Sequence, residues 1–66
     1  MITIKEQIQR NVNEGCSFEL YGLSTDEKPL ITYNHSNIAN ASVFYEMDTK
    51  TVYMYNAEDH EWLSQA

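Results

Sequence analysis

The sequence is poor in the residues that usually hold a small domain together. It has one cysteine, so no disulfide forms within the chain, and it has one proline and two glycines among 66 residues. A chain of this length buries only about 60% of the surface that its unfolded form exposes. We therefore expect one small domain, residues 1–66, that gains stability from oligomerisation or from docking on a larger protein.

Basic residues are also few. Four lysines and arginines stand against ten aspartates and glutamates, which gives a net charge of -6. Non-specific binding to nucleic acid and docking on anionic membranes both need a basic surface, so both are excluded as expected functions. The sequence has no long hydrophobic run and no export signal, and its lone cysteine agrees with a reducing compartment. We expect a protein partner inside the cell, or inside an assembly built there.

The residue patterns of common active sites are missing as well. There is no glycine-rich phosphate loop and no CxxC pair, and Cys16 is expected to be a small buried hydrophobe. Asp59, His60 and Glu61 are consecutive, so in a strand they point to opposite faces and do not converge on a metal ion. Glu46 and Asp48 are interpreted as the charged tip of a hairpin. We predict no catalytic residue, no metal site and no cofactor, and hence no enzyme.

The N-terminal segment has the spacing of an amphipathic helix. Ile4, Ile8 and Val12 recur every four residues, and Gly15 follows in a position typical of a helix C-terminus. This predicts a helix over residues 4–14. An isolated helix of this length is marginal in water, so it is expected to cover one face of a sheet or to dock on another chain.

The rest of the chain, residues 17–64, is predicted to be β-rich. Residues 17–23 alternate apolar and polar side chains, as a strand does. Residues 24–29 form a polar turn or loop and residues 34–41 are mainly loop, and a short strand at residues 30–33 is left open. Residues 42–64 contain three apolar stretches separated by two polar turns, which predicts a three-stranded meander. The predicted fold class is α+β: a short N-terminal helix with a small antiparallel β-meander of three to five strands.

The meander has two faces of different character. Pairing across Thr49 and Lys50 would set Tyr45 opposite Met54 and Phe44 opposite Tyr55. One face then carries mainly aliphatic side chains and is the expected core: Val43, Tyr45, Met47, Val52 and Met54. The other face carries Phe44, Glu46, Tyr53 and Tyr55, which is too apolar for ordinary solvated surface. Either the helix covers this second face, or a partner does, or the aromatic pairs simply stabilise a small sheet.

Two stretches resemble a known pattern. FELYGLSTDEKP at residues 18–29 and NASVFYEMDTKTVYMY at residues 40–55, followed by Trp62, are similar to small proteins encoded by bacteriophages and prophages of Gram-positive bacteria. In these, a GxSTDxKP stretch precedes an NGSxFxEMDTGKxYMY…W hairpin. The resemblance covers residues 18–63. This sequence departs from the pattern at Ala41, where glycine is usual, and at Lys50-Thr51, which replaces Gly-Lys.

The resemblance implies a non-enzymatic phage protein of the kind often encoded among virion-structure genes. We expect an accessory or minor structural protein that docks on capsid, connector or tail proteins, with a homo-oligomer left open. The alternative is a small acidic inhibitor of a host defence or nucleic-acid-processing protein. The expected location is the virion or the host cytoplasm. The predicted protein-binding residues lie on the aromatic face: Phe44, Glu46, Tyr53, Tyr55 and Trp62.

Overall fold

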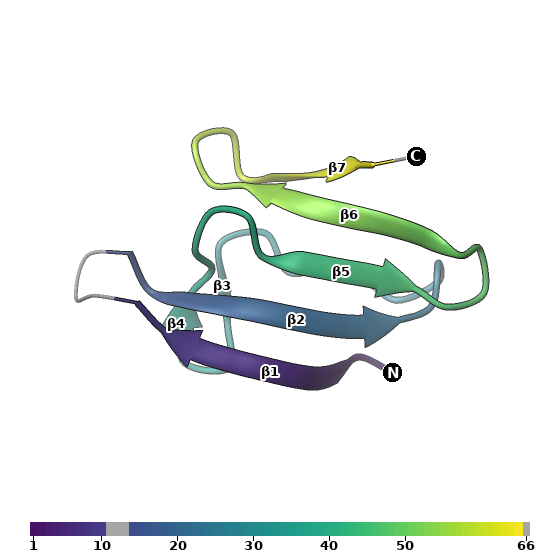
Figure 1. Cartoon of the computed structure of the whole chain (residues 1–66), viewed down its shortest axis with the longest axis horizontal. Coiled ribbons are helices and arrows are strands. Elements are labelled where there is room, and N and C mark those ends of the chain that lie inside the picture. The colour runs from purple at the N-terminus through teal and green to yellow at the C-terminus, as the bar shows by residue number, and fades with distance from the viewer. Residues whose placement is uncertain (11–13, 66) are drawn as a thin grey trace.

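Five strands form one mixed sheet, and two very short strands form a separate hairpin (Figure 1). The structure is a computed structural model, and it describes residues 1–10 and 14–65. The order in the large sheet is β1–β2–β5–β6–β7, and β2 and β5 run parallel while the other neighbours are antiparallel. The strands are β1 (Thr3–Gln9), β2 (Cys16–Gly22), β3 (Thr32–Tyr33), β4 (Ser36–Asn37), β5 (Val43–Glu46), β6 (Thr51–Asn56) and β7 (Glu61–Ser64).

The fold is therefore all-β, and the prediction of an α+β fold with a helix over residues 4–14 is wrong. Residues 3–9 form β1, which pairs antiparallel with β2, and the predicted positions 11–13 lie outside the described residues. A spacing of four residues is compatible with a regular strand as well as with one stripe of a helix, so it did not discriminate between the two. In β1 itself a shift of register after Ile4 places Ile4 and Ile8 on opposite faces. Pairing with β2 adds contacts with the rest of the sheet, whereas an isolated helix of this length is marginal in water.

The core lies on one face of the sheet. Every second residue of β2 is buried, from Cys16 through Phe18 and Leu20. Phe44 of β5 and Tyr55 of β6 complete this face. Residues 23–42 connect β2 to its parallel neighbour β5, and we call them the strap. A parallel pair needs a long crossover connection, and the strap runs over the core face, behind the sheet in Figure 1.

The predicted meander is confirmed, but its register differs by two residues. Phe44 lies opposite Tyr53 and Tyr45 opposite Val52, because residues 47–50 form a four-residue turn instead of a two-residue one. A shift of two leaves every side chain on its predicted face. The roles of the faces are reversed, however. The face with Phe44 is the core, and the face with Val43 and Tyr45, which was expected to be the core, is the outer one.

Several turns use a left-handed backbone without glycine. Ala41 has φ of 65° and Lys50 has φ of 58°, and these are the two positions at which this chain has another residue where the phage pattern has glycine. A residue with a Cβ is strained in this region by about 1–2 kcal/mol, whereas glycine adopts it readily.

We predict that Ala41→Gly and Lys50→Gly each raise the free energy of unfolding by about 0.5–1 kcal/mol, because relief of left-handed strain outweighs the added freedom of the unfolded chain. Urea denaturation of the purified variants measures this. Glu27→Gly is the control, since Glu27 is exposed and has no positive φ, and this substitution is expected to be neutral or destabilising. Destabilisation by all three glycines would show that the turns carry no strain.

Candidate protein-interaction face

The five predicted binding residues all belong to the covered side of the sheet. Phe44, Glu46 and Tyr55 are 0%, 4% and 3% exposed, so in this fold they offer no surface to a partner. Tyr53 and Trp62 are half-buried and pack against the core. The strap occupies the place that the sequence assigned to another protein. Partner contact by any of the five stays a prediction, and only Tyr53 and Trp62 keep accessible parts for it.

An ion pair joins the strap to the sheet. The Lys28 ammonium group donates to Oε2 of the buried Glu46 carboxylate, and the Thr49 hydroxyl donates to Oε1 over 2.8 Å. These hydrogen bonds hold the pKa of Glu46 below its usual value, with Lys28 as the larger cause. Lys28 Nζ also lies 4.9 Å from the ring centre of Phe44 and 4.5 Å from that of Tyr53. One lysine thus satisfies a buried carboxylate and caps two aromatic rings.

The next two residues of the strap bind the aromatic side chains directly. Trp62 Nε1 donates to the Pro29 carbonyl oxygen over 2.7 Å, and the Tyr55 hydroxyl donates to the Leu30 carbonyl oxygen. His60 Nδ1 lies 3.2 Å from the same hydroxyl oxygen. Burial raises the pKa of Tyr55 above its usual value. The polar atoms of both aromatic side chains are therefore used within the chain, as buried tyrosine and tryptophan require.

Two more carboxylates hold the beginning of the strap. Asp48 accepts the Ser24 hydroxyl over 2.5 Å and the Ser24 amide over 2.9 Å, and both lower its pKa. The Asp26 carboxylate accepts a hydrogen bond from the Met1 amino group over 2.8 Å and another from the Leu23 amide over 2.8 Å. Both hydrogen bonds lower the pKa of Asp26, and the one from the amino group has the larger effect. We use the name clasp for the four anchoring residues on the strap and their partners on the sheet; the anchors are Ser24, Lys28, Pro29 and Leu30.

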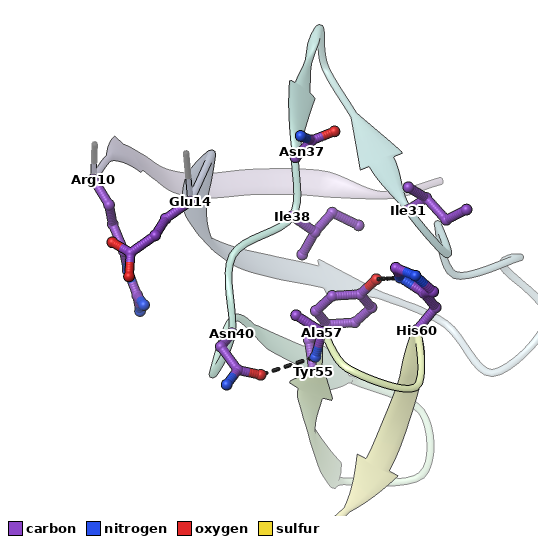
Figure 2. A pocket seen from close by; sticks show the side chains of 9 residues that line it. All are labelled: Arg10, Glu14, Ile31, Asn37, Ile38, Asn40, Tyr55, Ala57 and His60. Carbon is purple, nitrogen blue, oxygen red and sulfur yellow. Dashed lines mark hydrogen bonds between the residues drawn. The ribbon is translucent and has the colours of Figure 1, made fainter. Parts of the chain in front are cut away.

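A pocket of about 330 Å³ lies where the end of the strap meets the β1–β2 and β6–β7 turns (Figure 2). Ile38 and the ring of Tyr55 form part of its apolar wall. The lining also includes the charged side chains of Arg10 and Glu14 and the imidazole of His60. The Tyr55 hydroxyl and His60 already contact each other. The pocket therefore joins an apolar wall to polar side chains from the strap and the two turns.

The other face of the sheet is open. The chain measures 34 × 21 × 15 Å, which leaves room for the sheet and one covering layer, and the strap is that layer. Across β2, β5, β6 and β7, the cross-strand partners on the open face are mainly apolar. We call this set the open stripe: Tyr21, Val43, Tyr45, Val52, Met54 and Leu63.

The open stripe is continuous and partly accessible. Tyr21 and Tyr45 are neighbours on the parallel strands, with ring centres 5.6 Å apart. Met54 is 36% exposed and its partner Leu63 is 44% exposed. Glu61 lies at the β7 end of the same face. The stripe therefore combines aromatic and aliphatic side chains next to carboxylates, a composition that suits contact with another protein.

Neither a metal site nor a membrane span is found in the described part of the chain. No group of three or more histidine, cysteine, aspartate or glutamate side chains gathers within residues 1–10 and 14–65. The same residues contain no helix of the length and hydropathy needed to cross a bilayer. The chain matches no protein family model, no curated protein and no solved structure.

Sequence reasoning did not place Tyr21 and Leu63 on the same face as the rest of the open stripe. The alternation in residues 17–23 already separated Tyr21 from Phe18 and Leu20, so the signal was present. The parallel pairing of β2 with β5, which sets Tyr21 beside Tyr45, had no local signal. Two strands separated by the whole strap pair through long-range contacts, and no turn motif marks them.

We predict that Lys28→Met lowers the melting temperature far more than Lys5→Met does. The methionine keeps the length of the side chain but leaves the buried Glu46 carboxylate without its cation, whereas Lys5 is exposed. Circular dichroism at neutral pH measures both transitions. Equal melting temperatures for the two variants would show that the ion pair does not hold the strap.

The three lowered pKa values predict acid lability. Asp26, Glu46 and Asp48 bind protons less readily in the folded chain than in the unfolded one. Their contribution to stability is present above the ordinary carboxyl pKa of about 4 and is lost as the pH falls through the lowered folded values. The melting temperature should therefore drop as the pH is lowered from about 4.

Asp48→Asn tests this assignment. It is expected to lower the melting temperature at pH 7 and to make its fall with acid less steep, because one of the three carboxylates no longer titrates. Glu58→Gln is the matched control, since Glu58 is an exposed turn residue. An acid profile for Asp48→Asn that runs parallel to that of the control would remove Asp48 from the account.

Proposed function

We propose that this protein is a non-enzymatic accessory component of a bacteriophage particle, and that it docks through the open stripe on a capsid, connector or tail protein. The open stripe is the observation that carries the proposal. The chain closes one face of its sheet with its own strap and leaves the opposite face apolar. A small acidic protein gains solubility from charge on its surface, so an apolar face that it keeps open fits a contact made with another protein.

The charge of the chain favours a partner of opposite sign. The net charge is -6, and carboxylates stand at both ends of the open face, Glu6 and Glu19 on β1 and β2 and Glu61 on β7. A second copy would bring the same negative charge against this face. A partner surface with an apolar centre and a basic rim is complementary to it, which speeds encounter and disfavours wrong partners.

The phage context is supported by the resemblance described above, and the clasp gives that resemblance a physical meaning. The strap residues Ser24, Lys28 and Pro29 come from the first stretch of the pattern, and they bind Asp48, Glu46 and Trp62, which come from the second stretch or follow it. The two departures from the pattern fall on the left-handed residues Ala41 and Lys50, where glycine is favoured. In this chain, the residues that match the pattern hold the strap on the sheet.

The net charge of -6 also suits a second function, inhibition of a host defence or nucleic-acid-processing protein. The two functions differ in one observable. A structural or accessory component is present in purified particles, whereas an inhibitor acts in the host cell. Mass spectrometry of purified particles from the bacterium that carries the gene separates them, and absence of the chain from particles would favour the inhibitor.

We predict that Leu63→Lys reduces incorporation into particles at least tenfold while the melting temperature stays close to that of the wild type. A lysine on the open stripe adds a desolvation cost and a charge of the same sign as the proposed partner rim. Leu30→Lys is the control, because Leu30 is 59% exposed but belongs to the strap on the other side of the sheet. The readout is the amount of tagged chain per purified particle. Equal incorporation of both variants would exclude the open stripe as the docking surface.

A further inference from the structure

A bulge in β1 determines which side chains of this strand lie on the open face of the sheet. The register with β2 shifts between Ile4 and Glu6, so Lys5 lacks a partner in the ladder and Glu6 lies opposite Glu19. In an unbroken antiparallel register Lys5 would lie opposite Glu19, and the strands would gain an attractive pair of opposite charges. The bulge therefore replaces a favourable cross-strand pair with two carboxylates.

The bulge also turns Ile8 outward. Ile4 stays on the core side opposite Leu20, but Ile8 pairs with Ser17 on the open face and is 53% exposed. One benefit of the bulge is clear from the structure. Gln7 reaches the core side, where its Oε1 accepts a hydrogen bond from Asn34 of the strap over 2.6 Å. This contact depends on the shift of register, but it does not explain a glutamate at position 6.

Common reasons for surface carboxylates do not account for this pair. Charge on an edge strand prevents unwanted strand pairing, which fits Glu6 on β1, but Glu19 lies on the inner strand β2. Solubility explains the number of acidic residues and not the placement of two directly opposite each other. Like charges in this position repel and destabilise the sheet. Within residues 1–10 and 14–65, neither carboxylate forms an ion pair, and Glu19 Oε1 accepts only the Tyr21 hydroxyl over 3.2 Å.

The surroundings of the pair suit a guanidinium group. Tyr21 follows Glu19 by two residues on the same face, and its ring belongs to the open stripe. Arginine donates five hydrogens in a planar fork, so it bridges carboxylates and stacks on an aromatic ring, which the compact ammonium of lysine does less well. Ile8, on the adjacent row, adds apolar surface beside the same place.

We infer, resting on the proposed function, that the open face fits a protein partner that lays apolar side chains on the open stripe and inserts an arginine between Glu6 and Glu19. The partner cation neutralises the repulsion that the free chain carries. The chain is then less stable alone than it would be with glutamine at these positions, and the difference is recovered on binding. This is the signature of a residue pair kept for recognition.

The first test measures the free chain. The double variant E6Q/E19Q removes both charges with little change of shape, and it is expected to raise the melting temperature above that of the wild type. The control E27Q/E58Q removes the same amount of charge from two exposed residues outside the open face, and a smaller rise is expected for it. Equal or lower stability of E6Q/E19Q relative to this control would overturn the inference.

The second test uses N-acetyl-arginine amide as the probe, titrated into the ¹⁵N-labelled chain at constant ionic strength. Amide shifts are expected to gather at Glu6, Glu19 and Tyr21, and to be at least threefold smaller with N-acetyl-lysine amide and in E6Q/E19Q. The E27Q/E58Q control should respond like the wild type. Shifts at other residues, or an equal loss in the control, would overturn the inference.

The outcomes separate this inference from the proposed function. A chain that binds the arginine probe as described but is absent from particles rejects the phage-particle function and keeps the arginine site. A chain found in particles at equal amounts as wild type and E6Q/E19Q rejects the arginine site alone. Light scattering tests whether a second copy of the chain occupies the open face. A dimer that Leu63→Lys converts to a monomer would assign the open face to a second copy and overturn the inference.

Discussion

The ion pair between Lys28 and Glu46 is the contact on which the covered side of the sheet depends. It lies where the strap crosses β5, and it places a charged group next to the rings of Phe44 and Tyr53. A buried carboxylate without a cation or donors is costly, so the sheet favours conformations in which the strap is closed. The other anchors, Ser24, Pro29 and Leu30, form hydrogen bonds from the same segment to Asp48, Trp62 and Tyr55.

The strap covers one face of the sheet and leaves the other accessible, so the side chains of the two faces have different surroundings. On one face, aromatic side chains serve the interior, and their polar atoms bind strap carbonyl oxygens. On the other, Tyr45 and its neighbours stay accessible beside Glu19 and Glu61. The residues on which the resemblance to phage proteins rests lie mainly on the first face and in the strap. Substitutions on the open face can therefore leave the clasp contacts intact, because the side chains of the two faces lie on opposite sides of the sheet.

The sequence alone predicted the meander of residues 42–64 and which residues of β5 and β6 share a face, because alternation and polar turns are local signals, but it assigned the core to the wrong face. It failed at three points for physical reasons. The spacing of Ile4 and Ile8 suits helix and strand equally. The aromatic face appeared too rich for a lone chain because the strap was interpreted as a polar loop, although Ile38 and Ala39 within it are buried. The parallel pair of β2 and β5 joins distant segments, which no short pattern reports.

That parallel pair has a consequence for how the chain folds. The β1–β2 hairpin and the β5–β6–β7 meander each form from residues near one another in sequence, whereas joining them requires Leu20 and Phe44 to meet across the whole connection. Bringing distant residues together costs the chain conformational entropy before the new contacts stabilise it. The docking of the hairpin on the meander is therefore expected to limit the folding rate. The hairpin and the meander would each form quickly, and their docking would be the slow step after which the chain unfolds as a single cooperative unit.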